Sequence, residues 1–186
     1  MNNSSSYLTQ VRRCQALLGS CPGPAGPAGP AGPGVSPVYA SFLSSTTQNV
    51  TVTNPVAVTY SERTIGSINV NGGTYPNSVI VIPTTGVYKV LLSAQCDTVT
   101  GTHYLEMFPV VNGFTVPSSN TRIRLTAATE SCLTVEYFLS FNAGDQLQLY
   151  MVGDNTNARI VAITRGTGTP TVPDVPSIIV TIMRIA

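Results

Sequence analysis

The sequence contains no tryptophan, a single histidine and few charged residues. Charged side chains make up 9% of its 186 residues, against about 25% in an average soluble domain. The nine lysines and arginines are scattered from Arg12 to Arg184 and form no basic stripe of the kind that binds phosphate backbones. We therefore expect no nucleic-acid partner. With 42% hydrophobic residues, the chain is predicted to cover its surface with Thr, Ser, Asn and backbone, or to bury it against other copies.

Long apolar runs are also missing. No stretch approaches the roughly 18 apolar residues of a membrane span, so we expect no membrane partner. The opening residues, MNNSSSYLTQVRR, lack the apolar centre of a secretory signal. We therefore expect the protein to reach an outer surface by assembly on a particle. A virion surface is favoured, with a bacterial spore surface or an extracellular location as the alternative.

The residues of common active sites are present only as isolated groups. His103 is the only histidine, which excludes a multi-histidine zinc site, and no GxSxG turn accompanies it. A triad with Asp97 can be drawn, as can a carboxylate pair among Glu106, Glu130 and Glu136. Ordinary strand positions account for all of these residues. We predict that the protein is not an enzyme and uses no cofactor.

Two aspartates fall in turns, Asp145 in GDQ and Asp154 in GDN. An aspartate in such a turn accepts backbone hydrogen bonds. No dense cluster of acids of the kind found in calcium loops surrounds either residue. A structural role is preferred, and calcium binding stays open.

The four cysteines have neither CxxC nor metal-site spacing. Cys14 and Cys21 flank the start of a Gly-Pro tract, and the sequence leaves open whether they form links between chains. Cys96 is in phase with apolar strand residues and is predicted to be a buried free thiol. For Cys132 the sequence decides nothing.

The most distinctive segment is a short collagen-like tract, CPGPAGPAGPAGPG, at residues 21–34. Glycine recurs at every third position, at Gly23, Gly26, Gly29 and Gly32, as a triple helix requires because only a hydrogen side chain fits at its crowded axis. Proline follows each glycine and never takes the Y place, which animal collagens fill with hydroxyproline. The period predicts three chains, and a length of about 40 Å makes the tract a stalk.

The chain is predicted to have three parts. Residues 1–20 form an anchor segment with a short helix over 4–19, residues 21–35 form the collagen-like stalk, and residues 36–186 form one head domain. The helix has coiled-coil spacing for less than two heptads, at Tyr7, Val11, Cys14 and Leu18. It either docks the chain onto a surface or is a frayed amphipathic end.

From Val38 onward the sequence has the pattern of β-strands. Segments rich in Val, Ile, Thr and Tyr are separated by Gly, Pro or Asn turns. In LTVEYFLSF one face is predicted to carry the apolar residues Leu133, Val135, Tyr137, Leu139 and Phe141. This pattern predicts an all-β fold with two antiparallel sheets. The predicted strands are 38–43, 49–53, 56–60, 67–70, 78–82, 87–95, 103–111, 122–127, 133–141, 146–152, 159–164 and 177–185.

Three stretches resemble the globular heads of the complement component one, subcomponent q, and tumour necrosis factor superfamily. They are PTTGVYKVLLSAQ, FLSFNAGDQLQLYM and the closing SIIVTIMRI. Gly86 and Tyr88 match a Gly-x-Tyr that begins a family strand, and Gly144 with Asp145 matches a Gly-Asp turn. The resemblance covers residues 38–186 and implies a jelly roll that forms a homotrimer through its broad faces.

Together these features predict a non-enzymatic trimeric head, displayed on a particle and joined to other coat or capsid proteins through its N-terminal segment. A viral minor capsid or fibre protein is the preferred hypothesis. The alternatives are a spore-surface filament protein and a soluble trimeric ligand that binds a receptor or glycan.

Three long polar or Gly/Pro-rich loops are candidates for recognition of a host receptor or glycan. They span residues 71–77, 112–121 and 165–176, and jelly-roll loops often carry binding sites. Tyr75, Phe114 and Arg165 are the side chains best able to anchor a contact. The alternative is that these loops seal the trimer or touch neighbouring coat proteins.

Overall fold

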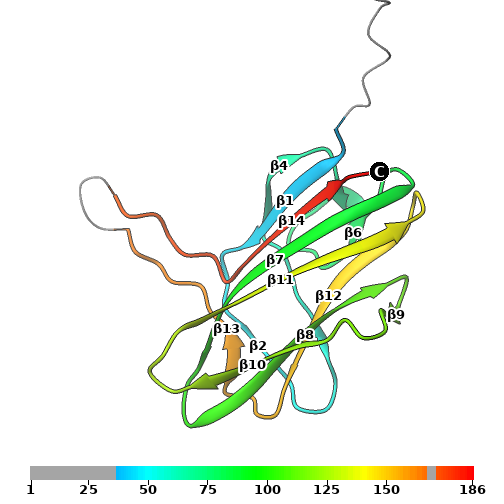
Figure 1. Cartoon of the computed structure of the whole chain (residues 1–186). Helices are drawn as coiled ribbons and strands as arrows, with labels where there is room; N and C mark the ends of the chain where they lie inside the picture. The colour runs from blue at the N-terminus through cyan, green and yellow to red at the C-terminus, as the bar shows by residue number, and fades with distance from the viewer. Residues whose placement is uncertain (1–36, 167–170) are drawn as a thin grey trace, which may run out of the picture. The chain divides into compact units, whose positions relative to one another are not determined.

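The computed structural model describes residues 37–166 and 171–186, which form an all-β sandwich of two sheets (Figure 1). Every strand pair is antiparallel. The prediction of an all-β, two-sheet antiparallel fold is therefore confirmed. The predicted anchor helix and the stalk glycines Gly23, Gly26, Gly29 and Gly32 lie outside the described residues, as do Cys14 and Cys21.

The strands divide evenly between the two sheets. The first sheet has the order β2 (Gln48–Asn49), β13 (Ala158–Ile160), β7 (Gly86–Thr98), β14 (Ile178–Arg184), β1 (Tyr39–Ser44) and β4 (Glu62–Gly66), with β11 (Ser131–Phe141) also paired to β7. The second has the order β10 (Thr121–Thr126), β8 (Thr102–Val111), β12 (Gln146–Gly153), β6 (Ile80–Val81) and β5 (Asn69–Val70). In addition, β3 (Val56–Ala57) pairs with β12 and β9 (Phe114–Thr115) with β8, and a 3-10 turn covers Asn71–Gly73.

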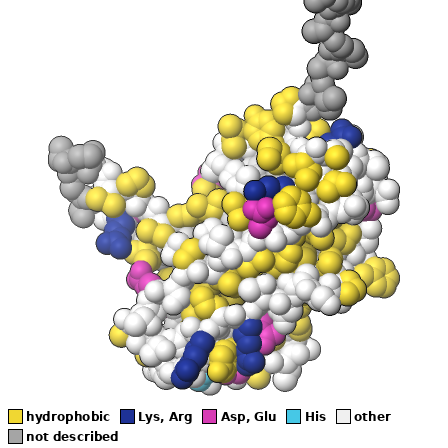
Figure 2. Space-filling view, in the orientation of Figure 1, with side chains coloured by type: hydrophobic (Ala, Val, Ile, Leu, Met, Phe, Trp, Pro, Cys, Tyr) yellow, Lys and Arg dark blue, Asp and Glu magenta, His cyan; other side chains and the backbone are white. Residues whose placement is uncertain are grey.

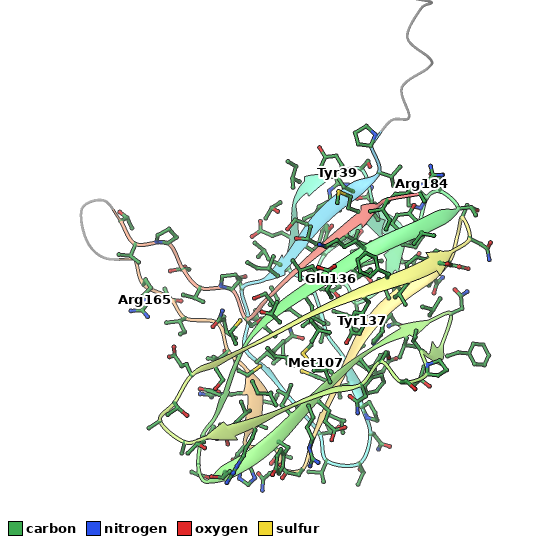
Figure 3. All side chains as sticks on the ribbon, in the orientation of Figure 1. Tyr39, Met107, Glu136, Tyr137, Arg165 and Arg184 are labelled. Carbon is green, nitrogen blue, oxygen red and sulfur yellow. The ribbon has the colours of Figure 1, made fainter. Side chains whose placement is uncertain are left out.

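The core lies between the sheets and is built by strict alternation along the long strands. On β7 every second side chain from Tyr88 to Thr98 is buried, because successive side chains of a strand point to opposite faces. On β11 the predicted apolar face is confirmed, since Leu133, Tyr137 and Phe141 are buried. Figure 3 shows Tyr137 and Met107, from opposite sheets, directed into the space between them.

Several predicted strands are shorter than expected, and two strands, β4 and β9, were not predicted. Of the predicted strand 49–53 only Asn49 belongs to an observed strand, because the chain then bends so that Val50 enters the core and Val52 faces solvent. The predicted strand 159–164 ends at Ile160. The edge strand β4 was not predicted, because it pairs with β1 through its backbone while its sequence, ERTIG, has no apolar alternation.

The first and last described residues of the sandwich lie at the same end. The Arg184 amide donates to the Val38 carbonyl (2.8 Å), and the Val87 amide donates to the Ala186 carbonyl (2.8 Å). We call this end the base. The opposite end, where β7 turns into β8 and β10 turns toward β11, is called the tip. Each loop can therefore be assigned to one end of the head.

The connection between β13 and β14 stands out from the sandwich as an arm (Figure 1). Its two sides are joined by an antiparallel bridge between Ile163 and Val175, whose backbone hydrogen bonds measure 2.9 and 2.8 Å. The Arg165 amide donates to the Asp174 carboxylate at 2.7 Å. The arm is therefore held at its root by its own contacts.

Candidate functional site

The surface of the first sheet that points away from the core carries an unusual number of apolar side chains. Phe138 is 61% exposed, Met183 45% and Ile179 40%. Figure 2 shows hydrophobic side chains gathered over β1, β14, β7 and β11, around a single pair of opposite charges. We call this surface the outward face and define it by Tyr39, Leu43, Ile65, Leu91, Phe138, Ile179 and Met183.

Strand register places these side chains in rows across the sheet. Met183 lies opposite both Tyr39 and Lys89, and Lys89 lies opposite Phe138. A second row joins Leu43 to Ile179. Neighbouring side chains on one face of an antiparallel sheet contact each other. The result is a broad apolar surface that spans four strands.

One ion pair crosses the outward face. The Lys89 ammonium lies 2.7 Å from a Glu136 carboxylate oxygen, and both side chains are about one-third exposed, at 35% and 37%. Figure 3 shows Glu136 on this face, next to Tyr137, which points the other way. In solvent such a pair contributes little to stability. Under a partner subunit it would be desolvated, so its geometry would then restrict how that partner packs.

The outward face was not predicted residue by residue. Its signal is the second alternation in SIIVTIMRI, where Ile179 and Met183 are out of phase with the buried Ile178, Val180 and Ile182. An apolar residue on both faces of a strand indicates burial on both sides. In a monomer the first sheet is covered on one side only, so this pattern pointed to a partner.

The two cysteines of the described part differ in environment. Cys96 is a buried free thiol, as predicted, and burial raises its pKa to about 12. Cys132 is exposed on the outward side of β11, with its sulfur 3.2 Å from the Ser93 hydroxyl. Reactivity of a thiol follows its thiolate fraction and access. The two cysteines should therefore behave differently toward thiol reagents.

We expect Cys96 to react with a maleimide at pH 8 at least a hundredfold more slowly in the folded protein than in guanidinium chloride. The physical reason is that a thiol buried in apolar surroundings is both inaccessible and protonated. Peptide mapping by mass spectrometry separates its label from that of the other cysteines, and the labelling rate of the same peptide in guanidinium chloride provides the comparison. Labelling of Cys96 in the native protein at its denatured rate would contradict the described core.

The motif residues Gly86 and Tyr88 lie at the base of the head. A Cβ at Gly86 would overlap the Ala186 carbonyl oxygen and the Arg184 side chain, so only glycine allows the last residues to approach β7. The buried Tyr88 donates its hydroxyl to the Thr84 carbonyl at 2.7 Å and packs edge-on against Phe141, with ring centroids 5.6 Å apart. These residues therefore close the base of the sandwich.

Gly144 and Asp145 form the tight turn between β11 and β12. Gly144 has a φ of +89°, which favours glycine. The Asp145 carboxylate accepts from the Asn112 side-chain amide (2.8 Å) and from the Asn142 backbone amide (2.7 Å). Both hydrogen bonds lower the pKa of Asp145 below its usual 3.8, and the one from Asn112 has the larger effect. The aspartate is thus a turn-stabilising group that links two loops at the base.

The structure does not bring the three predicted recognition side chains together. Tyr75 packs against the core, and its hydroxyl is buried without a hydrogen-bond partner. Phe114 is 79% exposed on β9, whose loop starts at the base because the Asn112 side-chain oxygen accepts from the Gln146 amide at 2.8 Å. Arg165 projects from the arm (Figure 3). The three side chains therefore belong to three separate surfaces.

The residues considered for catalysis are dispersed as well. Asp97 pairs with Arg159, with 2.7 Å from Oδ1 to Nε, whereas His103 Nδ1 lies 3.5 Å from Asp154 Oδ1. The triad of His103 with Asp97 that can be drawn from the sequence is therefore not formed. In the described ranges no three His, Cys, Asp or Glu side chains lie together as metal ligands would. Nor does this part of the chain contain a helix of the length and apolar character needed to cross a bilayer.

Comparison with solved structures identifies the fold as the jelly roll of the complement 1q and tumour necrosis factor kind. Eiger TNF from S. frugiperda matches with a TM-score of 0.50 at 12% identity, covering 81% of this chain and 93% of that one. The globular domain of zebrafish complement 1qA protein matches at 0.51 and 14%, covering 81% and 98%. Murine APRIL matches at 0.51 and 10%, covering 81% and 100%.

No family model matches the sequence. No curated protein matches it either. At 10 to 14% identity the structural similarity establishes the fold and leaves function to be argued from the molecule's own surfaces.

Proposed function

We propose that this protein is a non-enzymatic homotrimeric head that has a structural and adhesive role on the surface of a particle. In this proposal the outward faces of three heads meet around a common axis, and the collagen-like stalk connects them to the N-terminal segment. That segment joins the head to other coat or capsid proteins. The particle we propose is a virion, with the chain as a minor capsid or fibre component.

The apolar outward face is the observation that carries this proposal. A continuous exposed apolar surface is typical of interaction surfaces, and Phe138 is an aromatic side chain of the kind that contributes much of the binding energy at interfaces. The sequence independently specifies the number of copies, because the glycine period of residues 21–34 is that of a three-chain helix. A trimeric head would also hold three stalks together at high effective concentration.

The Gly-Pro-Ala triplets support a viral or bacterial source, since proline is absent from the Y place that animal collagens hydroxylate. A spore-surface filament tip is the second candidate, because the same triplets fit it equally. Genomic neighbourhood separates the two: capsid genes beside this one support the virion, and spore-coat genes support the spore.

The purified protein should sediment as a species of three times the 19.5 kDa chain mass at micromolar concentration. A closed cyclic trimer buries the outward face of every copy, whereas a monomer leaves it in water. Analytical ultracentrifugation measures this directly. A monomer or a dimer under these conditions would contradict the proposal.

A further inference from the structure

The tip of the second sheet carries basic and aromatic side chains on the surface turned away from the core. Arg122 and Arg124 are exposed on β10, on the side opposite to the buried Leu125. In the register of β8 and β10, Arg122 lies opposite Glu106 and Arg124 lies opposite Tyr104. Figure 2 shows basic side chains with a hydrophobic one between them at the lower end of the molecule, where these two strands lie.

Arg122 is held in place by two contacts. Its guanidinium carbon lies 3.8 Å from the centre of the Tyr104 ring, and its Nε lies 3.3 Å from a Glu106 carboxylate oxygen. Glu106 also accepts from the Asn120 side-chain amide at 2.5 Å. A guanidinium stacked on a tyrosine and paired with a carboxylate has little freedom left. Arg122 therefore fixes the Tyr104 ring and neutralises Glu106.

The other carboxylate in contact with Tyr104 is also engaged. Asp154 Oδ1 accepts from the Tyr104 backbone amide at 2.8 Å and lies 3.5 Å from Nδ1 of His103. Glu106 and Asp154 thus both have partners, and neither is paired with Arg124. Within residues 37–166 and 171–186, Arg124 has no carboxylate within 4 Å and makes no side-chain hydrogen bond.

From this arrangement we propose that the tip binds the carboxylate of an acidic sugar in a glycan, with Arg124 as the residue that pairs with it. The planar guanidinium of an arginine matches a carboxylate with two parallel hydrogen bonds. Tyr104 lies opposite Arg124. Because Arg122 covers one face of the Tyr104 ring, the tyrosine would contact the sugar through its hydroxyl, which can donate to or accept from a sugar hydroxyl beside the paired acid. One free arginine fits a single negative charge, whereas a polyanion requires a row of cations.

The position of this site agrees with a role in recognition. The site lies near the tip. The base, where the Val38 carbonyl and Ala186 are hydrogen-bonded to strands of the first sheet, is the opposite end of the sandwich. The inference rests on the proposed function in one respect, namely that a displayed head presents this end outward. The proposed recognition site is therefore formed by the neighbouring strands β8 and β10, and not by the loop residues Tyr75, Phe114 and Arg165 that were predicted from the sequence.

The test uses the full protein immobilised on a sensor and three polyacrylamide probes that carry lactose, sialyl-lactose or sulfated lactose. We expect the sialylated polymer to bind and plain lactose to bind at least tenfold more weakly. Arg124→Ala should reduce binding of the sialylated polymer at least tenfold, because a charge-assisted pair is lost. Arg124→Lys should retain part of it, since lysine keeps the charge without the fork. Arg184→Ala, which removes an arginine at the base, is the matched control and should bind as the parent does.

Several results would overturn the inference: no binding of the sialylated polymer, equal binding by Arg124→Ala and the parent, or binding of the sulfated polymer alone. Sedimentation of each variant is measured in parallel. A protein that binds the sialylated probe through Arg124 but is monomeric supports this site and contradicts the proposed trimer. A trimer that does not bind the probe supports the proposed trimer and contradicts this site.

Discussion

Replacing Phe138 with aspartate should convert the proposed trimer into folded monomers. Phe138 is 61% exposed on the outward face, so the substitution leaves the core between the sheets untouched. Lys89 is already paired with Glu136 at 2.7 Å, and the new carboxylate would therefore add an uncompensated charge. Burying such a charge costs several kcal/mol per protomer, and symmetry repeats this cost in every copy. Sedimentation measures the change in mass, and circular dichroism confirms the fold.

Phe114→Asp is the matched control for this experiment. Phe114 is more exposed than Phe138, at 79%, and lies on β9 of the second sheet. The same chemical change should therefore leave the trimer intact. If both variants stay trimeric, the outward face of the first sheet is not the interface. If both become monomers, the interface includes the second sheet.

Leu92→Ala should destabilise the head by about 2–5 kcal/mol, the usual cost of truncating a fully buried leucine. Leu92 is fully buried on β7 and lies opposite Val135 of β11 and Val180 of β14. The whole stability of a domain is about 5–15 kcal/mol, so the variant should lose a large part of it. The measurement is chemical unfolding in the Phe138→Asp background, where assembly does not contribute to the unfolding free energy.

Leu91→Ala is the neighbouring control, because Leu91 points from the same strand to the outward face. In the monomeric background it should change stability by less than about 0.5 kcal/mol, as ordinary surface substitutions do. In the otherwise unchanged protein it should weaken the trimer. If Leu91→Ala and Leu92→Ala destabilised the monomer equally, the conclusion that Leu92 points into the core and Leu91 to the outward face would be wrong.

Alternation made most of the fold predictable. A strand exposes successive side chains to opposite sides, so the apolar phase of residues 133–141 correctly predicted which face of β11 is buried. The same reasoning correctly predicted that Cys96 is buried. It failed for β4, because an edge strand needs only backbone pairing and ERTIG carries no apolar alternation.

Sites built from several strands could not be predicted in the same way. Tyr75, Phe114 and Arg165 were selected for residue type and loop position, and the structure places them on three separate surfaces. Tyr104, Arg122 and Arg124 were not predicted to form a group, because nothing in the sequence aligns β8 with β10. Only the register of the two strands places Arg124 opposite Tyr104.

The sequence by itself determined the strand-rich character of the chain and which side chains of its long strands are buried. Through the glycine period it also predicts three copies. These properties follow from local periodicities of two and three residues, which need no knowledge of distant contacts. The tertiary structure alone decided which strands are neighbours, and hence that Phe138, Ile179 and Met183 share one apolar face. Pairing joins residues far apart in the chain through backbone hydrogen bonds that are common to all residue types, so side-chain patterns alone do not identify which strands are neighbours.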